Sequence, residues 1–199
     1  MKVKRQTQAE RTEATRSALT DAARLLFGER GYARVGTEEI VRSAGVTRGA
    51  LYHHFGGKQD LLEAVYRQVE EEITGQIAAV ALESGGTSPL GGMRAGVVMF
   101  IDACVKPDVQ RIVLLDAPAV LGWDRWREIA ASYGLGLIEG TLTAAMEAGE
   151  IDPQPVKPLA HVLMGALDEA AMLVARSPDP AAREEVIAVL DRLLASLGR

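Results

Sequence analysis

The chain has 199 residues, of which 48% are hydrophobic and 25% are charged. This composition supplies a buried core and excludes a largely disordered chain. The single cysteine, Cys104, excludes an intramolecular disulfide and fits a reducing cytosol. The first residues contain no apolar run, and apolar stretches such as residues 97–101 and 112–115 are too short to span a bilayer. We therefore expect a cytoplasmic protein without a signal peptide and without membrane contact.

The formal net charge of −5 is divided unevenly along the chain. Residues 1–60 contain eleven Lys and Arg against seven Asp and Glu, a net charge of +4, so residues 61–199 carry −9. A basic first part on an acidic remainder is typical of a chain that binds nucleic acid at one end. A chance distribution is the alternative.

Helix patterns dominate from the start of the chain. Residues 12–30 place apolar side chains at spacings of three and four, and Gly31 can end this helix in a left-handed conformation. Thr37 is expected to cap a second, short helix, because two glutamates follow it in the first turn. That helix is expected to end at Ala44.

A tight turn and a third helix follow. Gly45 supplies the turn because it tolerates positive φ, and Thr47 is expected to cap a helix that runs to about Phe55. The residues at the start of this helix are small or polar, so that it can approach DNA closely. Two short helices joined by a glycine turn form a helix-turn-helix pattern, in which the second helix enters the major groove.

The rest of the chain predicts further helices. Apolar residues recur every four positions over residues 58–83, and the stretch 84–88 resembles a linker. Pro89 and Pro107 suit first helical turns, whereas Pro118 falls within an apolar run and should kink or end a helix.

Three helices are predicted after Pro118. They cover about residues 123–148, closed by Gly149, then 156–176 and 180–197. No segment shows sustained strand alternation. The predicted fold is all-α with about nine helices, with a DNA-binding head at residues 1–57 and a body at residues 58–199.

Residues 12–62 resemble the DNA-binding head of TetR-family transcription regulators. The resemblance covers about a quarter of the chain and rests on the order and spacing of many positions. One departure is Gly57, where the family often places Ser or Asn. The matching residues are Ala22-Ala23-Arg24-Leu25-Leu26-Phe27, Gly31-Tyr32, Thr37, Ile40, Ala44-Gly45-Val46, Gly49, Leu51-Tyr52-His53-His54-Phe55, Lys58 and Leu61-Leu62.

The resemblance implies eight residues that contact DNA. Thr47 and Arg48, at the start of the recognition helix, would read base edges, since an arginine can donate two hydrogen bonds to guanine. Gly49 and Ala50 would permit close approach to the bases. The other implied contacts, with phosphates or nearby bases, come from Thr37, Tyr52, His53 and Lys58.

Several of these residues have a second interpretation. Lys4 and Arg5 form either a minor-groove arm or a disordered tail. Tyr52 packs between helices in the alternative reading, and His54 is expected to be packed or solvated. Adjacent histidines point about 100° apart on a helix, so this pair is a poor metal site. We expect no metal and no cofactor.

The last two helices have broad apolar faces. The resemblance implies that they pair with their copies across a two-fold axis and form a four-helix interface in a homodimer. An ordinary core within one chain is the alternative. The residues predicted at the interface are Leu159, Leu163, Ala166, Leu167, Ala170, Val186, Leu190, Leu193, Leu194 and Leu197.

Residues 89–150 are the predicted sensing region, and residues 116–128 resemble a stretch in one subgroup of TetR-type C-terminal domains. Aromatic and methionine side chains suit an apolar ligand pocket, although they are also common in plain cores. His161 is expected to be a packed or capping residue unless a pocket surrounds it. The predicted lining is Met99, Phe100, Ala103, Trp123, Trp126, Tyr133, Leu137, His161 and Met164.

These features predict a DNA-binding transcriptional regulator, a repressor that a small-molecule effector releases from a palindromic double-stranded operator. The motion would pass along the helix of residues 58–83. An activator or an architectural DNA-binding protein on the same fold is one alternative. An all-helical enzyme is the other, but the chain has no Gly-x-Ser-x-Gly, no His-Glu-x-x-His and no phosphate-binding glycine loop. Cys104 and His161 could pair in principle, yet nothing near them in sequence suggests an activated nucleophile.

Overall fold

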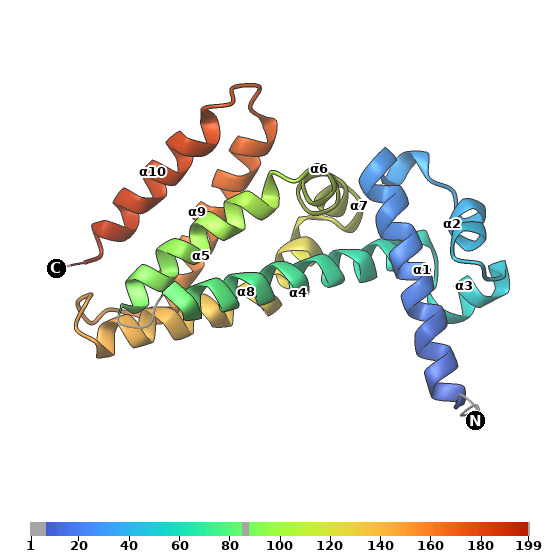
Figure 1. Ribbon diagram of the computed structural model, residues 1–199, viewed down its shortest axis with the longest axis horizontal. Helices are drawn as coiled ribbons and strands as arrows, with labels where there is room; N and C mark the ends of the chain where they lie inside the picture. The colour runs from blue at the N-terminus through green and yellow to red at the C-terminus, as the bar shows by residue number, and fades with distance from the viewer. Residues whose placement is uncertain (1–6, 85–87, 199) are drawn as a thin grey trace.

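The computed structural model describes residues 7–84 and 88–198 and is helical throughout its length (Figure 1). Lys4 and Arg5, predicted to form an arm or a tail, lie outside the described residues, as does the middle of the predicted linker. Figure 1 shows an elongated molecule with α1, α2 and α3 at one end and α9 and α10 toward the other.

The first three α-helices pack around a small closed core. The helix α1 (Gln8–Arg30) begins with a capping box, in which the Thr7 hydroxyl accepts from the Glu10 N–H and the Glu10 carboxylate accepts from the Thr7 N–H. A short 3-10 turn, η1 (Tyr32–Arg34), leads to α2 (Thr37–Ser43) and α3 (Arg48–His54). Fully buried apolar side chains from all three α-helices meet in this core: Leu19, Ala23, Phe27, Ile40 and Leu51.

The long helix α4 (Lys58–Ser84) joins this end of the molecule to the body. Its buried face runs through Leu61, Val65, Val69 and Ile73, the residues whose four-residue spacing predicted the helix. It packs against α1 near its start and against α5 and α8 farther along. One rigid element therefore touches both parts of the chain.

The body surrounds α4 with helices that close a second core. It contains α5 (Pro89–Cys104), α6 (Pro107–Val109), the π-helix η2 (Gln110–Asp116), α7 (Ala117–Leu121), α8 (Trp123–Glu147), α9 (Val156–Arg176) and α10 (Ala182–Ala195). Within the described residues, nine α-helices have five residues or more and the pairing is limited to one isolated bridge, Ile151 with Gly198, so the predicted all-α class is confirmed.

Most predicted helix ends agree with the structure, and two need correction. Gly31 and Gly45 have positive φ, as predicted, Gly149 follows the end of α8, and Pro89 and Pro107 stand in first turns. The prediction that Thr37 caps α2 is wrong: Gly36 holds that position without a side-chain bond, and Thr37 is the first helical residue.

The second correction concerns Pro118. The chain stays helical up to this residue, with φ −61° and ψ −51° at Ala117, and Pro118 lies in the first turn of α7. Proline has no N–H for the carbonyl four residues earlier. The wide π-helical stretch η2 directly before α7 takes the place of the predicted break.

By length and composition, α9 could cross a membrane, although a core helix of a folded protein passes the same test. The sequence predicts no apolar stretch of this length, because the charged residues of α9 interrupt its apolar runs. In this fold α9 packs against α5, α8 and α10.

Candidate DNA-binding surface and effector cavity

The turn between α2 and α3 fixes the direction of α3. Gly45 has φ +67°, and the Val46 N–H donates to the Val41 carbonyl oxygen at 3.0 Å, which closes the turn. Thr47 caps α3, as predicted, because its hydroxyl accepts from the Ala50 N–H at 3.2 Å. Leu51 faces the core, so the opposite side of α3 faces outward.

The outward side of α3 carries most of the residues predicted to contact DNA. Thr47, Arg48, Gly49, Tyr52 and His53 are exposed. The Arg48 side chain is 62% exposed, and one of its Nη atoms donates to the Glu38 carboxylate at 2.8 Å. Its guanidinium also lies 5.6 Å from the Tyr52 ring centre. The outward side of α3 is therefore polar and accessible, and contacts with Glu38 and Tyr52 hold the Arg48 side chain in place on it.

Two further candidates, and the neighbouring His54, are less open. Ala50 and Thr37 are half-buried, each in the first turn of its helix. His54 is also half-buried, and its carbonyl oxygen accepts from Arg16 at 3.4 Å. Among the described residues, no cluster of three or more His, Cys, Asp or Glu has the arrangement of a metal site.

Lys58 stabilises the head from within. Its ammonium donates to the carbonyl oxygens of Tyr32 and Val35, at 3.0 Å each, and lies 3.9 Å from the Tyr32 ring centre. Burial lowers the pKa of this amine. The first residue of α4 is thus fastened to the segment between α1 and α2, and its contact with phosphate stays a prediction.

The π-helix η2 makes a second connection between head and body. The Asp116 carboxylate accepts from the Tyr32 N–H at 2.7 Å, and Arg111 donates to the Gly28 carbonyl oxygen at 2.9 Å. On another side of η2, Val113 and Leu114 line a cavity in the body. Sequence reasoning did not find these contacts, because the partners are more than 80 residues apart.

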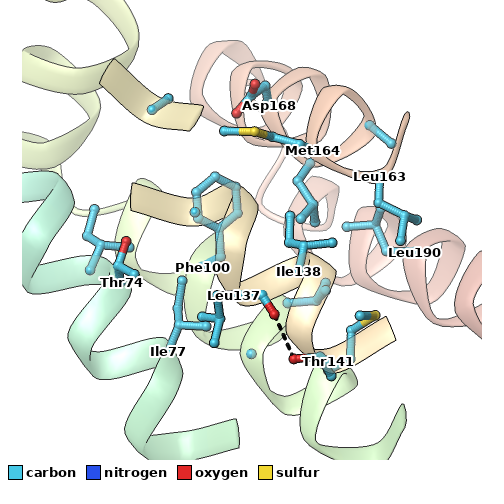
Figure 2. Close-up of a pocket in the computed structure, with 18 of the residues that line it drawn as sticks. Thr74, Ile77, Phe100, Leu137, Ile138, Thr141, Leu163, Met164, Asp168 and Leu190 are labelled. Atoms are coloured by element: carbon cyan, nitrogen blue, oxygen red, sulfur yellow. Dashed lines mark hydrogen bonds between the residues drawn. The ribbon is translucent and has the colours of Figure 1, made fainter. Parts of the chain in front are cut away.

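A cavity of about 120 Å³ lies inside the body, between α4, α5, η2, α8, α9 and α10 (Figure 2). Of the predicted lining, Phe100, Trp126, Leu137 and Met164 do lie on its wall. The prediction is wrong for five residues, which lie away from this wall: Met99, Ala103, Trp123, Tyr133 and His161. Two of them, Trp123 and His161, are exposed.

The wall of the cavity is apolar except for a few side chains. Two of these are already engaged: the Thr141 hydroxyl donates to the Leu137 carbonyl oxygen at 2.8 Å, and Asp168 pairs with Arg127. The other two, Glu70 and Thr74, belong to α4. Burial raises the pKa of the Glu70 carboxyl to about 7, so its neutral form is well populated near neutral pH.

The apolar surface of α9 and α10 differs in part from the predicted interface. Leu190 and Leu194 are buried in the body core, whereas Leu193 is 48% exposed. Val162 and Leu173 on α9 are 67% and 57% exposed. The half-buried members of that set are Leu159, Leu163, Ala166, Leu167, Ala170, Val186 and Leu197.

An exposed recognition helix on a helix-turn-helix head, joined by one long helix to an all-helical body with a cavity, defines a DNA-binding regulator. Residues 19–65 match the family model of bacterial regulatory proteins of the tetR family. Residues 90–197 match the tetracyclin repressor-like C-terminal domain. The chain therefore belongs to the TetR family and is a DNA-binding transcriptional regulator.

Similar proteins extend over nearly the whole chain. A TetR-family regulator from Pectobacterium atrosepticum is 33% identical, covers 97% of this chain and 98% of its own, and has a TM-score of 0.84. An HTH-type transcriptional repressor of Mycobacterium tuberculosis is 29% identical over 94% of each sequence. The solved complex of RolR with resorcinol is 19% identical, covers 94% of this chain and 90% of its own, and has a TM-score of 0.75, which shows a shared fold.

Proposed function

We propose that the protein is a homodimeric, cytoplasmic repressor that leaves its operator when a small apolar effector enters the body cavity. Residues 1–57 form the DNA-binding part and residues 58–199 the sensing and dimerising part. The observation that carries the proposal is the exposed, polar outer side of α3, with Arg48 held at its N-terminal end. The similarity to a repressor that spans nearly the whole chain supports the direction of regulation.

On DNA, the first turn of α3 enters the major groove. Arg48 exchanges its bond to Glu38 for two hydrogen bonds to a guanine, while Thr47 and Gly49 lie next to neighbouring base edges. Tyr52 and His53 contact phosphates or nearby bases, and Ala50 touches a thymine methyl group. The first turn of α2, at Thr37, binds phosphate by its free N–H groups.

The dimer forms through the outer faces of α9 and α10. Val162, Leu173 and Val189 are apolar side chains of this helix pair that are 47–67% exposed and would be costly to leave in water. Pairing with a second copy buries them and sets two heads about one DNA turn apart, roughly 34–36 Å. The operator is therefore palindromic.

The effector acts through α4 and η2, because both line the cavity and both are fastened to the head. A ligand that prefers a cavity shape incompatible with the DNA-bound head spacing shifts the population toward the released state. The mainly apolar cavity wall fits a small, mainly apolar compound, and RolR, a relative in fold, is known in complex with resorcinol, a single aromatic ring with two hydroxyl groups.

No catalysis is proposed. Cys104 is buried, and burial raises the pKa of its thiol to about 12, so its nucleophilic thiolate is scarce at neutral pH. An activator on the same fold would use the same surfaces, since the position of the operator decides the sign of regulation.

The test begins with selection of bound DNA from random sequence, followed by binding titrations at two salt concentrations. Arg48→Ala should weaken operator binding by about 1–3 kcal/mol for each half-site and change non-specific binding little. Lys106→Ala, which removes one positive charge from the body, is the control. Equal losses on operator and random DNA for Arg48→Ala would overturn base reading by Arg48.

A further inference from the structure

Two polar side chains of α4, Glu70 and Thr74, stand on the wall of a mainly apolar cavity, whose other polar side chains, Thr141 and Asp168, are engaged within the protein. They are four residues apart, so they lie one turn from each other on one face of the helix. Ile73 and Ile77 flank them on the same wall, and Figure 2 shows Thr74 on the α4 side of the cavity. Burying a carboxyl group in such a place is costly unless it has a hydrogen-bond partner.

The Glu70 carboxyl group makes fewer hydrogen bonds than a carboxyl group can make. The Tyr66 side chain on the preceding turn interacts with it, and a hydrogen bond donated by the Tyr66 hydroxyl lowers the pKa of Glu70 against the effect of burial. The same hydroxyl lies 3.3 Å from the Trp126 carbonyl oxygen, to which it can donate instead. One hydroxyl engages at most one Glu70 oxygen, so the other oxygen can accept from a ligand in the cavity.

Thr74 complements this acceptor. Its hydroxyl makes no hydrogen bond within the part of the chain that the structure describes, whereas the Thr141 hydroxyl across the cavity is engaged with its own helix. A hydroxyl that is half-buried and without a partner can both donate and accept. Glu70 thus offers a hydrogen-bond acceptor, and Thr74, one turn away on α4, offers a hydroxyl that can donate or accept.

The size of the cavity limits what these groups can bind. Its volume of about 120 Å³ is close to that of engineered apolar cavities, about 150 Å³, which take up benzene. A ligand of this size has one ring or a short branched chain. A carboxylate on it would face both Glu70 and Asp168, and an ammonium group would have to leave water for an apolar wall.

We propose that Glu70 and Thr74 bind the hydroxyl group of an uncharged effector about the size of one six-membered ring, whose apolar part lies against Phe100, Leu137 and Met164. This inference rests on the proposed effector cavity and adds the chemical class of the ligand. The ligand hydroxyl donates to Glu70 and shares a hydrogen bond with Thr74. Because both side chains belong to α4, the polar part of the ligand is held by the helix that begins in the head.

The test uses the full-length dimer and isothermal titration calorimetry with phenol, toluene and benzylamine. We expect phenol to bind the wild type about tenfold more tightly than toluene, as one or two buried hydrogen bonds would give. Benzylamine should bind more weakly than phenol. Glu70→Leu and Thr74→Val should each weaken phenol binding by roughly three- to tenfold and leave toluene binding unchanged. Glu70→Gln, which keeps an acceptor oxygen, should retain most of the preference for phenol.

The matched control is Glu71→Gln, an exposed neighbour on α4, which should bind all three probes like the wild type. If the wild type binds phenol and toluene equally, or binds benzylamine most tightly, the hydroxyl-binding pair is overturned while the cavity as an effector site stands. If phenol affinity survives in both Glu70→Leu and Thr74→Val, the pair is likewise overturned. Failure of all probes, toluene included, would overturn the effector cavity itself and this inference with it.

Discussion

The head and the body of this regulator differ in how completely side chains fill their interiors. The head closes around fully buried side chains such as Leu19, Phe27 and Leu51, and its helices follow one another closely in the chain. The body draws the wall of one cavity from residues 70 to 194 and keeps a carboxyl group inside it. A cavity and a buried carboxyl both cost stability.

The difference assigns the two regions different mechanical tasks. A closely packed head keeps α3 in one orientation, which reading of base edges requires. A body with unfilled volume can change shape when a ligand fills it, at a small cost in free energy. If this division holds, the stability cost lies in the body and the DNA contacts lie in the head.

The largest expected effect is on the dimer. Val189→Asp places a charge at an exposed apolar site of α10 and should leave a folded monomer whose operator affinity is about 100-fold lower or worse, because the two heads no longer bind together. Light scattering gives the mass and a titration gives the affinity. Leu82→Asp, at an 80% exposed site on α4, should remain dimeric. A Val189→Asp dimer of normal affinity would place the interface elsewhere.

The second effect is the pH dependence of stability. The pKa of Glu70 is raised to about 7 in the folded protein from an ordinary value of 4.5, so folding takes up a proton between these values. The contribution of Glu70 to stability is therefore complete below pH 4.5 and is lost as pH rises through about 7. Glu70→Gln should exceed the wild type in stability at pH 8 by about 2–3 kcal/mol and lose this advantage near pH 5. Thermal unfolding at both pH values measures it, and an advantage that is constant with pH would contradict it.

The third effect lies in the head. Lys58→Met removes two hydrogen bonds from a charged donor to the Tyr32 and Val35 carbonyl oxygens and should cost about 2 kcal/mol of unfolding free energy. Calorimetry follows this loss. If Lys58 also binds phosphate, the slope of log affinity for DNA against log salt concentration should become shallower by about one as well. Unchanged stability would show that these bonds contribute little.

The smallest expected effect is the loss of stability caused by backbone strain at a glycine, as distinct from a loss caused by a steric clash. A Cβ at Gly45 would meet nothing within 4 Å, but φ is +67°, so Gly45→Ala should cost about 1 kcal/mol through strain alone. Gly57→Ala has the same open surroundings without positive φ and should be neutral or slightly stabilising. Chemical denaturation of the pair tests this, and equal behaviour would contradict it.

Sequence was a good guide where structure is set by neighbours in the chain. The turn at Gly45, the cap at Thr47 and the long helix from Lys58 depend on residues within one or two helical turns. The cap predicted at Thr37 failed for a local reason, since Gly36 already has the extended conformation of a cap and the helix starts at Thr37, one residue earlier than a cap at Thr37 requires.

The sites in the body depend on distant partners, and there the sequence was weaker. The apolar face of α9 is broad, so periodicity alone could not tell which side meets its own chain and which, with Val162 and Leu173, faces outward. The presence of an aromatic side chain likewise did not predict which residues line the cavity. Glu70 was missed because a glutamate on a long helix is normally solvated, and only its burial beneath α5 and α8 gives it a role.

The packing of the two tryptophans has an optical consequence. Trp126 is 1% exposed, lies on the cavity wall and donates to the Val113 carbonyl oxygen, while Trp123, three residues earlier and with its ring centre 4.9 Å away, is 59% exposed. The chain contains no other tryptophan. Its intrinsic fluorescence therefore combines a short-wavelength emitter inside the body with a long-wavelength emitter in water, and an occupant of the cavity alters the first directly. The protein carries its own reporter of whether its interior is filled.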